Sequence, residues 1–250
     1  MNIKQIKERW RRDSLLKEVR EEYLSNQPPR GIPKRDWYEN FTPKEMHPYS
    51  EEYCADLRGI DFSGESLTSE HSFLEARLDY ACFANSKING ADFQRAALNS
   101  ANFSSCSITR ATFHPTFAHK VDFSKCSINF STFNGFNPMN QGPNLFGCSD
   151  LTSSSFEKSS VKNTAMNNVD FRQANFFDAV FTDCNFTASD LRGILINKET
   201  RFIRCNFRCA MLDRRNPFPE IFKEGSLSVV QDCQNIEDIN WITDASFPSP

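Results

Sequence analysis

Large apolar residues recur at every fifth position through the middle of the chain. The segment 91–105 contains the unit three times, as Ala-Asp-Phe-Gln-Arg, Ala-Ala-Leu-Asn-Ser and Ala-Asn-Phe-Ser-Ser. Each unit begins with a small residue, usually continues with a polar one, places a large apolar residue third, and ends with two mostly polar residues. This period matches neither the alternation of a strand nor the ~3.6-residue repeat of a helix. It predicts a chain that turns inward once every five residues.

The unit continues without a gap over more than sixty residues. The third positions are Phe73, Leu78, Phe83, Ile88, Phe93, Leu98, Phe103, Ile108, Phe113, Ala118, Phe123, Ile128 and Phe133. A chain of this kind forms no long strand, but it satisfies its backbone groups when each coil hydrogen-bonds the coil below it at roughly 4.8 Å. The pattern therefore predicts a solenoid.

The units from about Cys54 to Arg214 resemble those of the pentapeptide-repeat proteins, whose pattern is a small residue, Asp or Asn, Leu or Phe, and two polar residues. The resemblance implies a mainly β fold, a right-handed quadrilateral β-helix with four units per coil, and a phase of twenty residues between stacked positions. On that phase three inner columns are expected: Phe73, Phe93, Phe113 and Phe133; Phe83, Phe103 and Phe123 opposite them; and Ile88, Ile108 and Ile128 on a third face.

Three segments follow from the pattern. Residues 1–53 are expected to hold an N-terminal α-helical cap, because apolar residues recur at three- and four-residue steps between Met1 and Ser25, and an aromatic segment that covers the first coil. Residues 54–215 are the repeat. Residues 216–250 are expected to form a short C-terminal capping tail. In it Ile236, Ile239 and Trp241 are expected to cap the final coil, and Glu237 and Asp238 to lie near Arg204, Arg208, Arg214 or Arg215.

The repeat is interrupted by a loop at residues 136–148. Two Pro and two Gly stop the ladder there, while Phe136, Met139, Asn140 and Phe146 offer contact atoms to a partner. Two interpretations stay open at the level of sequence, a recognition loop and a tolerated insertion.

Charged residues also follow the twenty-residue phase. Asp150, Asp170 and Asp190 are expected to form a column on one face, with Thr152, Arg172 and Arg192 in a parallel column beside it. Stacked carboxylates repel one another, and the neighbouring arginines relieve that repulsion. A structural role is thus sufficient to explain the pattern. The candidate protein-binding residues of this face are Asp170, Arg172, Asp190 and Arg192.

No motif for catalysis, cofactor binding or metal binding is found. The chain lacks a phosphate-binding Gly loop, G-x-S-x-G and H-E-x-x-H, and its interior is expected to be filled by its own rings. Nine Cys without a C-x-x-C pair argue against zinc, and Cys106, Cys126, Cys184 and Cys205 occupy small first positions, where buried thiols are expected. The sequence predicts a protein that is not an enzyme and uses no cofactor.

The expected function is that of a non-catalytic protein-binding scaffold, with its faces and the 136–148 loop presented to a protein of unknown identity. No apolar run approaches the ~20 residues of a membrane span, and no signal-peptide core is present, so a cytoplasmic location is expected. The N-terminal helix could also join two copies as a homodimer.

Two alternatives come from other functional classes. The best-known function of the resembled family implies a DNA mimic that binds and protects a type II topoisomerase, DNA gyrase. Residues 51–215 hold eighteen acidic and seventeen basic residues, a net charge of −1, which weakens that alternative because mimicry needs an acidic surface. The third hypothesis is a bacterial effector that acts in a host cell. Direct binding of nucleic acid is not expected.

Overall fold

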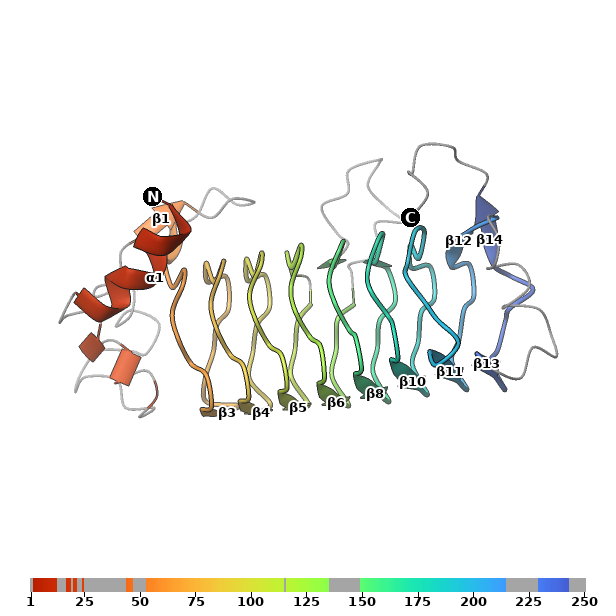
Figure 1. Cartoon of the computed structure of the whole chain (residues 1–250), viewed down its shortest axis with the longest axis horizontal. Coiled ribbons are helices and arrows are strands. Elements are labelled where there is room, and N and C mark those ends of the chain that lie inside the picture. The colour runs from red at the N-terminus through yellow and green to blue at the C-terminus, as the bar shows by residue number, and fades with distance from the viewer. Residues whose placement is uncertain are drawn as a thin grey trace.

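A computed structural model describes residues 2–12, 17–18, 20–21, 24, 44–46, 53–114, 116–134, 149–214 and 229–242. The described chain forms a rod of stacked coils, with helix α1 (Ile3–Arg12) at one end and the last strands at the other (Figure 1). The expected mainly β, right-handed, four-sided β-helix is confirmed.

One face of the rod is an eight-stranded parallel sheet with the order β13-β11-β10-β8-β6-β5-β4-β3. Its strands are β3 (Ser66–Thr68), β4 (Lys87–Asn89), β5 (Ser107–Thr109), β6 (Ser127–Asn129), β8 (Ser160–Lys162), β10 (Val180–Thr182), β11 (Arg201–Ile203) and β13 (Val230–Gln231). Three smaller pairs accompany it: β1 (Lys44–Met46) antiparallel to β2 (Tyr53–Ala55), β7 (Ser149–Asp150) with β9 (Val169–Asp170), and β12 (Met211–Asp213) with β14 (Asn240–Ile242).

Between Phe73 and Phe133 the core is a double stack of phenylalanine rings. Phe73 and Phe93 are parallel, with ring centroids 4.7 Å apart, and so are Phe83 and Phe103 at 4.6 Å. The two stacks meet edge to face, as at Phe83 and Phe93, whose rings lie 5.5 Å apart at 87°. Ile88 and Ile108 are Cα partners on the sheet. The twenty-residue phase and its three inner columns are thus confirmed.

The polar second position of a unit shapes the turn that follows it. The Ser104 amide donates to the Asn102 side-chain oxygen at 2.8 Å, and Ser105 then adopts a left-handed conformation with φ 61°. Asp122 accepts from the Ser124 amide in the same way. A short side-chain acceptor two residues before a turn amide stabilises such a bend, which explains why Asp and Asn recur at this position.

The insertion after Phe133 leaves the stack in register. Ile128 pairs with Val161, thirty-three residues later, where an uninterrupted coil would need twenty. The thirteen extra residues equal the length of the 136–148 segment. Residues 135–148 lie outside the described part of the chain, so the binding role of the loop stays a prediction.

The C-terminal tail covers the last coil by pairing with it strand to strand. Phe202 pairs with Val230 and Leu212 pairs with Trp241, and Ile239 is buried. The expected packing of Trp241 is confirmed. Arg204 pairs instead with Asp183 at 2.7 Å, and Arg215, another of the expected partners of the tail, lies outside the described residues.

Helix α1 lies against the first coil. Ile6 and Trp10 are buried there, whereas Ile3 is 50% exposed. No helix in the described residues is long and apolar enough to cross a membrane. The division of the chain at 53/54 and 215/216 stays a prediction.

Candidate binding face

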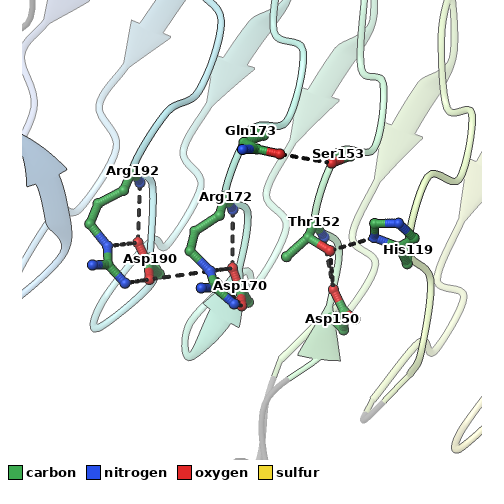
Figure 2. Close-up of polar contacts among 9 residues, drawn as sticks. All are labelled: His119, Asp150, Thr152, Ser153, Asp170, Arg172, Gln173, Asp190 and Arg192. Atoms are coloured by element: carbon green, nitrogen blue, oxygen red, sulfur yellow. Dashed lines mark hydrogen bonds and ion pairs between the residues drawn. The ribbon is translucent and has the colours of Figure 1, made fainter. Parts of the chain in front are cut away.

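The outward side chains around Leu151, Phe171 and Leu191 form a face whose polar contacts repeat from coil to coil. In each of these units the third residue points into the core and is fully buried, so the second and fourth residues point outward on either side of it. The aspartate–arginine face is defined here by Asp150, Thr152, Asp170, Arg172, Asp190 and Arg192. It comprises three successive coils, drawn in Figure 2.

Each arginine on this face binds the aspartate two residues before it. The Arg172 guanidinium donates from Nε to Asp170 Oδ1 at 2.9 Å and from its terminal nitrogen to Oδ2 at 2.6 Å. The Arg172 backbone amide donates to the same Oδ1 at 3.1 Å. One carboxylate therefore holds both the turn and the side chain of the arginine that follows.

The next coil repeats the arrangement closely. Arg192 donates to Asp190 at 2.9 Å from Nε and at 2.6 Å from its terminal nitrogen, and its amide donates to Asp190 at 3.1 Å. Arg172 Nε also lies 3.7 Å from Asp190 Oδ2, which links the two coils (Figure 2). These contacts relieve the repulsion between the stacked carboxylates, as the sequence predicts.

Hydrogen bonding to the paired aspartates raises the pKa of both Arg172 and Arg192 above the ordinary arginine value. The arginines stay charged, and 37% of the Arg172 side chain and 19% of the Arg192 side chain are exposed. Each guanidinium group on this face is thus held in one position, and its charge is largely balanced by the aspartate that it binds.

The polar ladder continues toward the N-terminus in a different form. Thr152 donates its hydroxyl to Asp150 at 2.7 Å, and the His119 Nδ1 lies 2.7 Å from the Thr152 oxygen. One coil earlier Asn99 donates to Asp79 at 2.7 Å. The sequence analysis did not place Asp79, Asn99 and His119 in the ladder. The twenty-residue spacing of positions 79, 99 and 119 was the signal that would have found them.

At the first coil the same face is covered by α1. Arg9 donates to both oxygens of Asp56, at 2.7 and 2.8 Å, and Arg58 binds the same carboxylate at 2.8 Å. Burial of Asp56 acts to raise its pKa, but the hydrogen bonds and charges of Arg58 and Arg9 outweigh burial and hold the pKa at about 2. This end of the face is a closed ion cluster between helix and rod.

The aspartates of this face are poorly placed to act as general bases. A carboxylate held in a bidentate pair with arginine is a poor general base, because the pair stabilises its charged form. Within the described residues no group of three or more His, Cys, Asp or Glu side chains is placed to hold a metal. The structure brings Asp170, Arg172, Asp190 and Arg192 together, whereas the four predicted loop residues lie outside the described part.

Comparison with known proteins identifies the repeat. The sequence profile of the family "Pentapeptide repeats" matches eight copies, over residues 76–114 and 154–193. No curated protein matches the chain significantly.

Solved structures similar to the chain include HetL, a pentapeptide repeat protein involved in heterocyst differentiation regulation in Nostoc sp. Strain PCC 7120. It is 12% identical over 76% of this chain and 92% of HetL, with a TM-score of 0.23. QnrB1, a plasmid-mediated fluoroquinolone resistance protein, is 17% identical over 76% of this chain and 90% of QnrB1, with a TM-score of 0.40. With such low identities and TM-scores, the functions of those proteins do not transfer to this chain.

Proposed function

We propose that this chain, a pentapeptide-repeat protein, is a non-catalytic binding rod whose aspartate–arginine face receives a protein partner. The observation that carries the proposal is the pair of arginines, Arg172 and Arg192, each fixed by its own aspartate and set one coil apart.

Fixing a long side chain before binding reduces the entropy that association costs, which is ~0.5–1.5 kcal/mol for each rotamer-rich side chain that is immobilised. Arginine is also enriched among the residues that contribute most to protein interfaces. Because Arg172 is held on one side by Asp170 and is partly exposed, it can donate hydrogen bonds to carbonyl or carboxylate groups of a partner without first being ordered.

The core supports a binding role over an enzymatic one. Phe103, Phe113 and Phe171 are fully buried and contact other core rings, so the interior of the rod is filled by its own side chains. Substrate pockets are concave and lined by convergent polar groups, whereas a filled solenoid offers extended faces.

The charge pattern favours this proposal over a DNA mimic for a topoisomerase such as DNA gyrase. A mimic of duplex DNA needs unbalanced negative charge along its length. On the aspartate–arginine face Asp170 and Asp190 are each matched by an arginine, and at the first coil Asp56 is matched by two. A gyrase supercoiling assay with added protein separates the alternatives, since a mimic inhibits or protects the enzyme in proportion to its concentration.

The proposal is tested by capture of partners from the source cell with immobilised full-length protein. Arg172→Ala should reduce capture of a specific partner about fivefold or more, in line with a loss of ~1 kcal/mol or more at an interface arginine. The matched control is Arg204→Ala, which removes a comparable bidentate pair with Asp183 at another corner of the rod. Equal capture by wild type and Arg172→Ala would contradict a role for this face. Loss of capture only on deletion of residues 136–148 would assign binding to the loop.

A further inference from the structure

Three cysteines stack on consecutive coils at the C-terminal end of the rod. Each occupies the small first position that follows a strand of the large sheet, and each thiol donates to the carbonyl oxygen of the core residue one coil earlier. The contacts are Cys184 to Val161 at 3.5 Å, Cys205 to Phe181 at 3.5 Å and Cys233 to Phe202 at 3.2 Å. The repeated contact shows that the three thiols occupy equivalent positions.

Cys205 and Cys233 are close enough to be joined. The Cys205 backbone amide lies 3.3 Å from the Cys233 sulfur. Two residues earlier Ile203 and Gln231 are Cα partners in the parallel sheet. Neighbouring strands lie roughly 4.8 Å apart, and disulfides span Cα separations of about 4.4–6.8 Å. The spacing of the two coils is therefore within the range that a disulfide spans.

The two thiols differ in access and in acidity. Cys205 is fully buried, whereas Cys233 lies on the terminal coil and is half-buried. The neighbouring Cys205 side chain lowers the pKa of Cys233, and burial raises the pKa of Cys205. The thiolate is the form that reacts with oxidants, so the accessible thiol of the pair is also the one that ionises more readily.

We propose that Cys233 and Cys205 form a peroxide-sensitive pair whose disulfide links the C-terminal coil covalently to the rod. The Cys233 thiolate attacks one oxygen of hydrogen peroxide, which breaks the O–O bond, releases hydroxide and leaves a sulfenic acid on Cys233. The Cys205 sulfur then attacks the Cys233 sulfur, and the sulfenic oxygen leaves as water with the proton of the Cys205 thiol. Two thiols lose two electrons in total, and one peroxide accepts them.

The disulfide would act on the terminal coil, which contains Cys233 and lies far from Cys205 in sequence. Cys205 and Cys233 are separated by twenty-eight positions, although they are adjacent in the stack. Among the described residues, β13 pairs with β11 alone and β14 with β12 alone. A covalent link closes that loop and restricts opening of the terminal coil.

The chain contains its own control pair. Cys106 and Cys126 also stack one coil apart, and each donates to the equivalent carbonyl oxygen at 2.9 Å. The neighbouring Cys126 side chain lowers the pKa of Cys106, as Cys205 lowers that of Cys233 in the terminal pair. Both of these thiols are only 2% exposed and lie in the middle of the rod. The two pairs thus share the stacking of thiols on successive coils and the contact with a core carbonyl, and they differ in access to the oxidant.

The test uses the full chain with Cys54, Cys148 and Cys209 replaced by serine, so that these thiols form no cross-links. Cys209 in particular is exposed and would join molecules to one another. The reduced protein is treated with equimolar hydrogen peroxide, blocked with iodoacetamide, and mapped by mass spectrometry without reduction. The expected product is a peptide pair joined through Cys205 and Cys233, with Cys106 and Cys126 unmodified until the protein is denatured. Hydrogen exchange in residues 229–242 should slow at least severalfold on oxidation and return to its starting rate with dithiothreitol.

Cys233→Ser should abolish both the cross-link and the change in exchange, whereas Cys126→Ser should leave both intact. Cys233→Ala serves as a second variant if the serine perturbs the coil, and circular dichroism checks that each variant is folded. Oxidation of Cys233 to sulfinic acid without a cross-link, or equal cross-linking of Cys106 and Cys126, would overturn the proposal.

Discussion

Arg9 and Asp56, forty-seven residues apart in sequence, form a buried bidentate ion pair in which the two terminal guanidinium nitrogens lie 2.7 and 2.8 Å from the two carboxylate oxygens. The same guanidinium also donates to the Asp56 carbonyl oxygen at 2.8 Å. Trp10 adds a hydrogen bond from its indole nitrogen to the Arg58 carbonyl at 2.8 Å. Helix α1 is therefore attached to the first coil by specific polar contacts as well as by its apolar side.

The Asp56 cluster should make stability depend on pH. The pKa of Asp56 is lowered from 3.8 to about 2 in the folded chain, so its contribution is fully present above about pH 4 and is lost as the pH falls toward 2. A shift of this size corresponds to about 2 kcal/mol. Asp56→Asn should therefore be about 2 kcal/mol less stable than wild type in urea at pH 7, and the gap should close near pH 2. A gap that is constant across this range would exclude titration of Asp56 as its cause.

Two glycines offer a matched test of how closely α1 packs. Gly59 and Gly64 both have left-handed φ values, of 70° and 75°, so alanine costs a similar ~1 kcal/mol of backbone strain at either position. A β-carbon at Gly59 would also lie 2.7 Å from Ile6 Cγ2 and 3.1 Å from the Ile6 backbone, whereas one at Gly64 meets nothing within 4 Å. Gly59→Ala should therefore displace the helix and quench or shift the Trp10 fluorescence, and Gly64→Ala should not. Identical spectra for the two variants would show that α1 does not rest on Gly59.

Truncation of a core ring should be costly because its neighbours cannot collapse into the space. Phe103 stacks on Phe83 at 4.6 Å and on Phe123 at 5.0 Å, and each of these is fixed by its own coil. Phe103→Ala should lower the free energy of unfolding by about 3–5 kcal/mol. Gln94→Ala, at an outward position, should cost less than ~0.5 kcal/mol. Chemical denaturation measures both, and similar losses would contradict the inward and outward assignment.

Removal of residues 229–250 should cause the rod to associate end to end. The deletion uncovers the outer edges of β11 and β12, and unpaired edges bind other strands. Residues 192–215 carry seven basic and two acidic residues, so two identical ends repel each other. Light scattering should show association that strengthens as salt screens this repulsion. Association that weakens with salt would instead indicate pairing of the basic end with residues 51–79, which hold eight acidic and two basic residues. A monomer at all salt concentrations would show that the edges do not need the tail.

The five-residue period of the sequence by itself determined most of the rod. Because the third position of each unit carries a large apolar residue, the inward direction of Phe83 or Phe103 follows from counting, and the twenty-residue phase implied by the family resemblance places one above the other. The aspartate–arginine columns follow from the same phase. This was possible because contacts in a solenoid join residues at a constant separation in sequence, so a local pattern specifies them.

The contacts that the sequence did not determine are those that cross an interruption of the period. The pairing of Arg9 with Asp56 depends on how an amphipathic helix docks, and its hydrophobic pattern alone permitted either a cap or a dimer. The pairing of Val230 with Phe202 and the stacking of Cys233 on Cys205 follow a segment that breaks the repeat, after which the phase can no longer be counted. In these places the register is chosen by packing and by the need of an open coil edge for hydrogen-bond partners, and only the tertiary structure shows which residues meet that need.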